Sequence, residues 1–238
     1  MLKLLTFKPA FGVRSPSPFC YKADALLTLA KLDFERVPSL PKDSPSGKLP
    51  ALIDADAVIC DSSLIQSYIE NTLNRPFHEK PSPSHSADAL AYKRMFEEHF
   101  YFVSLYLRWI KHPDVTKKAL FSEFPFGIRN LLFKMVQRSV LKQTTLQGIA
   151  RLSHETILEQ GLDDLNAVST RLTNQPYLLG NTLTTADIAL YPFLVNTAIA
   201  PFHTLLRERC REDSTLRTYC MNCELAVYGT TSAIDSWQ

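Results

Sequence analysis

Residues 47–70 read GKLPALIDADAVICDSSLIQSYIE, and this stretch carries the strongest structural signal of the chain. Two short apolar runs, 51–53 and 58–60, flank the polar turn at 54–56, which is typical of a β-hairpin. The next segment, 62–73, places its apolar residues on one face and so predicts an amphipathic helix. The stretch therefore predicts a β-β-α unit.

The sequence before this unit predicts a strand, a helix and a second strand. Residues 2–7 read LKLLTF, a short apolar run typical of a strand. Residues 18–32 repeat apolar side chains at helical spacing, and residues 35–37 are a candidate for the second strand. Followed by the unit at 47–70, the order is that of a thioredoxin-like domain. We therefore predict a small α/β domain over residues 1–77.

Proline usage indicates where this domain ends. Residues 76–84 read PFHEKPSPS, a run that should not form a helix, and we predict a linker at 78–85.

Residues 86–238 predict an all-helical second domain, so the fold class is α/β followed by all-α. Its helices are predicted at 87–111, 126–141, 154–172 and 185–200, the last of them opened by a capping box of Thr184 and Asp187.

Charge and composition exclude several classes of protein. The chain has 238 residues, and its 26 basic and 24 acidic residues give a net charge of +2, without the basic excess of a nucleic-acid-binding protein. No apolar run approaches the ~18 residues of a transmembrane helix, and the N-terminus does not read as a signal peptide. Five cysteines, an odd number, favour free thiols over a disulfide framework. We therefore expect a cytoplasmic protein.

The start of the helix at 18–32 is the first candidate site. Pro18 suits the first helical position, which places Ser17 at the N-cap. Free N–H groups and the helix dipole lower the pKa of a thiol held there below its usual ~8.5, and a serine hydroxyl can donate a hydrogen bond to the thiolate. The alternative is that Ser17 only caps the helix.

Two further candidates lie in residues 47–70. The Leu49-Pro50 bond is a candidate cis peptide, which would offer the Leu49 backbone to an extended peptide, with Lys48 near a ligand carboxylate. An ordinary trans turn with a solvated lysine is the alternative. Asp61 and Ser62 come just before a helix, where free N–H groups can bind a carboxylate and Asp61 an ammonium group. An α-amino acid end would need both functions.

Taken together, these features resemble the glutathione transferase superfamily, over nearly the whole chain. A closer resemblance is to the branch that contains the failed axon connections proteins and the metaxins. It rests on SPSPFCYKADALLTLA (15–30), residues 47–70, RMFEEHFYFVSLYLRW (94–109), LQGIARLSHETILEQGLDDLNAVSTRL (146–172) and YLLGNTLTTADIALYPFL (177–194). The resemblance implies a thioredoxin-like domain followed by a helical domain, glutathione as co-substrate, and a role in detoxification.

The resemblance also implies roles for particular residues. Ser17 takes the thiol-activating position, with Ser15 as its rival because the Ser-Pro dipeptide is repeated. Cys20 stands where related glutaredoxins carry the second cysteine of a C-P-x-C pattern, but Ser17 at the first position favours attack by glutathione's own thiolate. The implied glutathione-binding residues are Ser15, Phe19, Lys48, Leu49, Pro50, Asp61 and Ser62.

The second substrate implied by the resemblance is a small hydrophobic electrophile. We expect Phe11, Phe96 and His99 to contact it, the latter two from the aromatic helix at 87–111. A homodimer is usual for such folds. Two alternatives remain: a non-enzymatic, metaxin-like adaptor, and a glutathione-dependent thiol oxidoreductase acting through Cys20.

Two other patterns were weighed and predict no site of their own. Cys220 and Cys223 have a metal-like spacing, but no second pair accompanies them, so they predict helix packing and no metal site. Lys134, Arg138 and Lys142 form a basic stripe, which predicts a solvated helix face rather than contact with anionic lipid.

Overall fold

The α/β part of the chain is a four-stranded mixed sheet covered by two helices. The computed structural model describes residues 1–77, 82–232 and 234–237. This part contains β1 (Leu2–Thr6), α1 (Pro18–Leu29), β2 (Phe34–Pro38), β3 (Ala51–Asp54), β4 (Ala57–Cys60) and α2 (Ser62–Asn71). The strand order is β2-β1-β3-β4, with β1 parallel to β2 and the other neighbours antiparallel. The predicted hairpin is confirmed, since β3 pairs with β4 around a two-residue turn.

The remainder of the chain is helical, as predicted. Its helices are α3 (Pro83–Arg94), α4 (Tyr101–Tyr106), α5 (Pro113–Phe121), α6 (Phe126–Gln147), α7 (His154–Leu172), α8 (Thr185–Ile199), α9 (Leu205–Glu212) and α10 (Ser214–Tyr228). The helix predicted at 87–111 runs from α3 through α4, with the π-helical segments η2 (Met95–Phe100) and η3 (Leu107–Lys111) following each of them. The capping box predicted at the start of α8 is present. The sequence did not predict α5 or α9, and of α10 it predicted only helix packing at Cys220 and Cys223.

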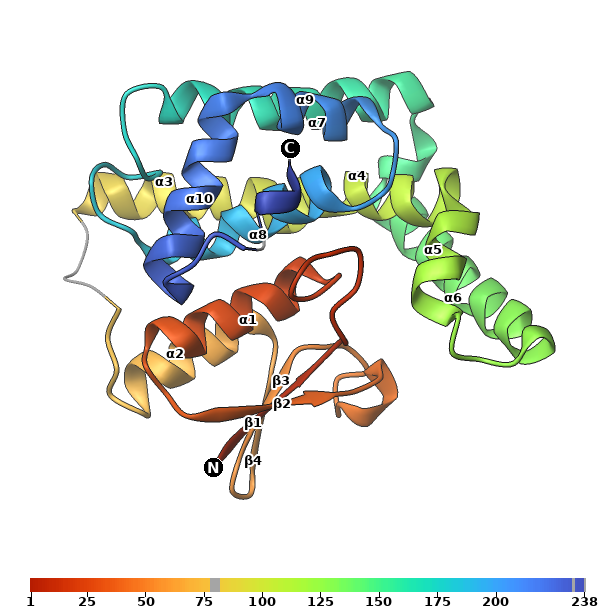
Figure 1. The fold of residues 1–238 in the computed structure, drawn as a ribbon, viewed down its shortest axis with the longest axis horizontal. Coiled ribbons are helices and arrows are strands. Elements are labelled where there is room, and N and C mark those ends of the chain that lie inside the picture. The colour runs from red at the N-terminus through yellow and green to blue at the C-terminus, as the bar shows by residue number, and fades with distance from the viewer. Residues whose placement is uncertain (78–81, 233, 238) are drawn as a thin grey trace.

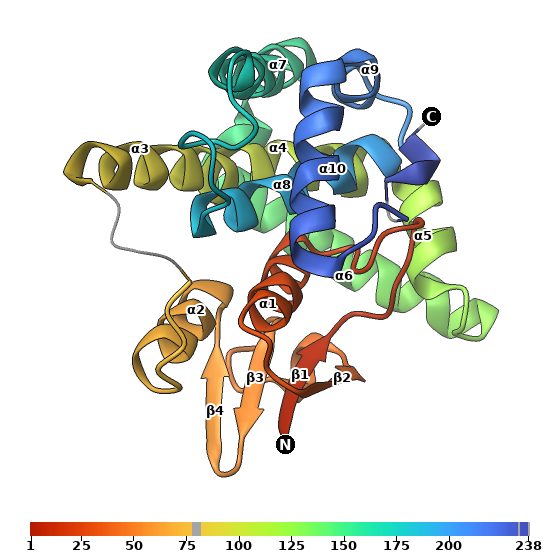
Figure 2. The same cartoon turned by 60° about the vertical axis from the view of Figure 1, so that its left-hand side comes forward.

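Helix α1 lies at the centre of the molecule. Figures 1 and 2 show it between the sheet and the helical part, with α8 and α10 against its other side. Nine of its twelve residues are buried, and one apolar cluster runs from the sheet through α1 into α8. Because both sides of α1 are covered, polar residues on this helix must find partners inside the protein.

The predicted linker overlaps the start of α3. Residues 78–81 lie outside the described residues, but α3 begins at Pro83, where Ser82 caps it by accepting a hydrogen bond from the His85 N–H at 3.2 Å. Proline fits the first turn of a helix, so the run at 76–84 does not exclude one at its end. The division into domains at 77 and 86 stays a prediction. No helix in the described ranges is both long and apolar enough to cross a membrane.

Candidate functional site

The loop that enters α1 is held from several sides. Ser17 is the N-cap residue, as predicted, and its Oγ accepts a hydrogen bond from the Cys20 N–H at 3.4 Å. Ser15 is buried, and its Oγ accepts one from the Ser17 N–H at 3.3 Å. From the helical part, Asn196 Nδ2 donates to the Ser15 carbonyl at 3.2 Å and Arg108 Nη1 to the Pro16 carbonyl at 2.6 Å. Both serines are therefore fixed in place.

The loop before β3 contacts both α1 and the start of α2. The Leu49-Pro50 bond is cis, which confirms the prediction. Leu49 is buried in a small cluster with Cys20 of α1. The Pro50 carbonyl accepts a hydrogen bond from the Asp61 N–H at 3.3 Å. The three predicted glutathione-binding segments therefore meet along one edge of the α/β part.

The start of α2 carries an unpaired hydroxyl. Asp61 is the N-cap residue, with Oδ1 accepting from the Ser63 N–H at 2.7 Å and the Leu64 N–H at 3.3 Å. Its φ of 86° lies in the left-handed region, which aspartate tolerates better than most residues. Ser62 is 1% exposed, and within the described ranges its Oγ has no hydrogen-bond partner. A buried, unpaired hydroxyl at the positive end of a helix dipole suits a bound carboxylate.

A buried ammonium group lies close to this helix start. Lys22 is fully buried, and its Nζ is 2.6 Å from Glu97 Oε1 of η2 and 3.1 Å from Ser63 Oγ of α2. Burial lowers the pKa of Lys22, and the ion pair with Glu97 opposes that shift. Sequence reasoning gave Lys22 no role. The available signal was a lysine within the mostly apolar stripe of the helix at 18–32.

The other predicted glutathione contacts differ in accessibility. Lys48 is exposed, as a residue that meets a ligand must be. Phe19 is half-buried between two aromatic rings of the helical part, 4.9 Å from Tyr101 and 5.5 Å from Phe193 between centroids. Phe19 therefore joins the two parts of the chain, with only part of its ring accessible.

Cys20 does not have the environment of a reactive thiol. Its side chain is fully buried, and burial raises the pKa of the thiol although the Ser17 hydroxyl opposes the shift. Cys60 is the partly exposed cysteine, and a hydrogen bond with Ser44 Oγ lowers its pKa. The sequence reasoning included Cys60 in a motif but gave it no role. Its position at the end of an edge strand was the available signal.

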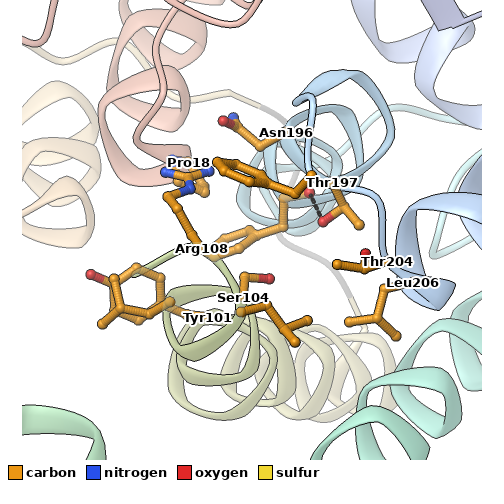
Figure 3. Close-up of a pocket in the computed structure, with 12 residues that line it drawn as sticks. Pro18, Tyr101, Ser104, Arg108, Asn196, Thr197, Thr204 and Leu206 are labelled. Carbon is orange, nitrogen blue, oxygen red and sulfur yellow. Dashed lines mark hydrogen bonds between the residues drawn. The ribbon is translucent and has the colours of Figure 1, made fainter. Parts of the chain in front are cut away.

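A pocket opens beside the start of α1, between this helix, α4 with η3, and α8 (Figure 3). Its volume is about 50 Å³, and its lining includes Pro18, Tyr101, Ser104, Arg108, Phe193 and Phe202. Phe11, predicted to contact the electrophile, packs edge-on against Phe202 with ring centroids 5.3 Å apart. One wall of the pocket is therefore formed by Pro18, which directly follows Ser17 in the sequence.

Phe96 and His99 do not line this pocket. Phe96 is fully buried against Phe100 and Phe193. His99 faces α7, where Nδ1 lies 2.6 Å from Asp164 Oδ2 and Nε2 3.3 Å from Gln160 Oε1. The prediction assumed α-helical spacing, but both residues lie in the π-helical segment η2, which changes the face each side chain occupies. Tyr101, Ser104 and Arg108 take the predicted place on the pocket wall.

The remaining patterns lie away from the pocket's lining. Cys220 and Cys223 are buried in α10, and in the described part of the chain no group of His, Cys, Asp or Glu could hold a metal ion. Lys134, Arg138 and Lys142 are exposed along α6.

Comparison with protein families matches both parts of the chain. Residues 18–115 match the glutathione S-transferase N-terminal domain, and residues 161–223 match the glutathione S-transferase C-terminal domain.

Several characterised proteins are similar in sequence. The isoprene-epoxide–glutathione S-transferase of Rhodococcus sp. (strain AD45) is 28% identical over 220 residues, covering 84% of this chain and 88% of that protein. Failed axon connections of Drosophila melanogaster is 27% identical over 215 residues, covering 82% of this chain but 51% of that protein. Metaxin-1 of Mus musculus is 27% identical over 187 residues, covering 72% and 59%.

Solved structures confirm the fold. The glutathione S-transferase CsGST63524 of Ceriporiopsis subvermispora, in complex with glutathione, superposes with a TM-score of 0.65 at 14% identity, covering 94% of this chain and 96% of that chain. The β-etherase LigF from Sphingobium sp. strain SYK-6 gives a TM-score of 0.60 at 17% identity, covering 92% and 98%.

Proposed function

Because the chain belongs to the glutathione S-transferase family, we propose that it binds glutathione and conjugates the glutathione thiolate to a small electrophile. The observation that carries the proposal is the position of Ser17. This residue caps α1 between two features: the edge formed by Leu49, Pro50 and Asp61, and the pocket that begins at Pro18. A peptide thiol and a second substrate would meet at this residue.

The proposed glutathione site follows the edge of the α/β part. The Leu49 backbone takes the middle of the peptide, and the start of α2 takes the γ-glutamyl end. The unpaired Ser62 Oγ and the positive end of the α2 dipole would hold the γ-glutamyl carboxylate. Asp61 is exposed and could accept a hydrogen bond from the ammonium group, while Lys48 lies near the other end.

In the proposed reaction, Ser17 favours the thiolate form of glutathione. Its Oγ accepts from the Cys20 N–H, which leaves its own O–H free to donate to sulfur. The positive end of the α1 dipole acts in the same direction. The thiolate then attacks the electrophilic carbon, a C–S bond forms, and the bond to the leaving atom breaks with its electron pair.

An epoxide is the electrophile that one similar protein suggests. The similar Rhodococcus protein is named for conjugating an epoxide of isoprene, a molecule small enough for a narrow pocket. Opening of the ring forms the C–S bond, breaks one C–O bond, and leaves an alkoxide that takes a proton from water. A role in detoxification, a cytoplasmic location and a homodimer stay predictions.

The serine-based reading is tested by two matched variants. Ser17→Ala should lower kcat for conjugation about tenfold to hundredfold, since a hydrogen bond to a charged group contributes about 1.5–3 kcal/mol, while glutathione affinity measured by calorimetry changes little. Ser15→Ala is the control, because Ser15 is buried and bonded to the Ser17 N–H. A fully active Ser17→Ala with an inactive Ser15→Ala would transfer the role to Ser15. Absence of glutathione binding in the parent protein would favour the adaptor.

The oxidoreductase alternative depends on access to Cys20. Because Cys20 is buried with a raised pKa and Cys60 is partly exposed with a lowered one, alkylation of the native protein near neutral pH should modify Cys60 first. Mass spectrometry of the labelled peptides measures the order. Modification of Cys20 at the rate of Cys60 would restore the thiol exchange mechanism.

A further inference from the structure

The guanidinium group of Arg108 lies in the pocket without an acidic partner. Its Nη1 donates to the Pro16 carbonyl at 2.6 Å, and its Cζ lies 5.5 Å from the ring centroids of both Phe11 and Phe202. Among the described residues, no carboxylate oxygen lies within 4.0 Å of its nitrogens, whereas Arg14 and Arg209 each pair with one. Figure 3 shows the side chain crossing the pocket toward Pro18.

This arrangement is energetically unfavourable for a charged group. Burial lowers the pKa of Arg108 to about 10, so the group still carries its charge at neutral pH, although the residue is only partly accessible to solvent. A guanidinium has five N–H donors, and one hydrogen bond to a carbonyl leaves most of them unused. Desolvated charges in proteins are usually paired, and this one faces a cavity instead.

The cavity wall supplies another donor beside the guanidinium. Ser104 also lines the pocket, four residues before Arg108, and within the described ranges no hydrogen bond of its hydroxyl was found. The rest of the lining is largely apolar, with Phe193, Phe202 and Leu206 among it. Such a site combines apolar walls with donors and one positive charge, which is complementary to an acyl or aryl group that ends in an anion.

We propose that Arg108 binds a carboxylate on the second substrate, so that the protein conjugates glutathione to small electrophiles that carry an anionic group. This inference rests on the proposed function and names the substrate class of the same site. The pocket volume of about 50 Å³ agrees with a small group, since a cavity needs about 10–15 Å³ of such volume to hold one water molecule. Planar carboxylates also match the fork of the guanidinium.

The first test measures binding without turnover. Cyclopropanecarboxylate and cyclopropanecarboxamide have nearly the same shape and differ in charge, and both lack a reactive ring oxygen. Titration of the protein followed by ligand NMR should show at least about tenfold tighter binding of the carboxylate. Arg108→Gln should abolish the difference, and Arg138→Gln, which removes an exposed arginine of α6, should preserve it. Equal binding of the two probes by the parent protein would overturn the proposal.

The second test uses the matched epoxides glycidate and glycidamide with glutathione, with the thioether products measured by mass spectrometry. The ratio of kcat/KM for the acid to that for the amide should fall about tenfold or more in Arg108→Gln and partly recover in Arg108→Lys. If Arg108 instead stabilised the glutathione thiolate, both substrates would slow equally and the ratio would stay constant, which would also overturn the proposal.

The two tests separate failure of this inference from failure of the proposed function. Glutathione affinity measured by calorimetry, together with conjugation of glycidamide, reports on the proposed function alone. A protein that conjugates the amide but shows no charge preference contradicts only the role of Arg108. A protein that binds neither glutathione nor the epoxides contradicts the transferase, and the cyclopropane probes still decide whether Arg108 holds an anion.

Discussion

Two arginines contact opposite sides of the α1 region, and their surroundings differ. Arg14 lies between α1 and α10, where its Nη2 is 3.3 Å from Glu224 Oε2 and its Cζ is 3.6 Å from the ring centroid of Tyr228. Glu224 also accepts a hydrogen bond from the buried Tyr21 hydroxyl. Arg108, on the pocket side, has no acidic partner in the described part of the chain.

The network around Arg14 continues along α1 to Asp24. The Tyr228 hydroxyl donates to Asp24 Oδ1 at 2.8 Å, and Arg36 pairs with the same carboxylate. Both arginines and both carboxylates of this network therefore have a partner of opposite sign. The difference shows that charged groups which join the two parts of the chain have partners within the protein. The charge of Arg108 in the pocket has no such partner, so a ligand would have to supply one.

The largest effect should follow from breaking the paired side. Glu224→Ala removes the acceptor of both Arg14 and Tyr21 at a fully buried position, and should lower the free energy of unfolding by about 3–5 kcal/mol. Urea denaturation at neutral pH measures the change. Glu123→Ala is the matched control, because its ion pair with Lys8 is exposed and should contribute less than about 1 kcal/mol. Equal losses in the two variants would mean that the buried network is not structural.

The α/β part was predictable because its signals are local. Pro18 and Ser17 define the start of α1, and Asp61 defines the start of α2, each within a few residues of the helix it caps. The hairpin before α2 follows from two apolar runs and one short turn. These features depend on neighbours in the sequence, so patterns of residues were sufficient to find them.

The parts that were missed depend on contacts between distant residues. Lys22 pairs with Glu97, 75 positions away, and Tyr21 bonds to Glu224, 203 positions away. No spacing rule connects residues so far apart, and a polar residue in an apolar stripe gives no sign of which partner will satisfy it. His99 was predicted to contact the electrophile and does not line the pocket, because no periodicity in the sequence distinguished a π-helical segment from an α-helix.

A partly exposed histidine paired with a buried aspartate should show an intermediate effect that depends on pH. The hydrogen bond from His99 to Asp164 raises the pKa of His99 in the folded state above the ordinary 6.5. The folded protein therefore binds this proton more tightly, so the added stability is fully present below about pH 6.5 and is lost as pH rises through the folded-state pKa. His99→Gln should remove this dependence.

The pH effect is obtained as a difference between two proteins. Melting temperatures of the parent and of His99→Gln, measured from pH 5.5 to 8.5, should converge toward the alkaline end. Subtraction cancels groups common to both proteins, such as His112, whose pKa burial lowers. A constant gap across this range would show that the pair contributes through packing and not through charge.

The smallest effect should follow from removing the unpaired cation. Arg108→Met gives up the hydrogen bond to the Pro16 carbonyl and the contacts with Phe11 and Phe202, each contributing about 1 kcal/mol, but it also relieves the desolvation of a charge. These contributions oppose one another, so the free energy of unfolding should change by less than about 1 kcal/mol in either direction.

Arg14→Met is the matched comparison, because it leaves the buried Glu224 carboxylate without its cation and should cost about 3 kcal/mol or more. Urea denaturation of both variants under one set of conditions measures the contrast. Equal destabilisation would make Arg108 a structural residue like Arg14, whereas stability retained with loss of the acid preference assigns its charge to the ligand.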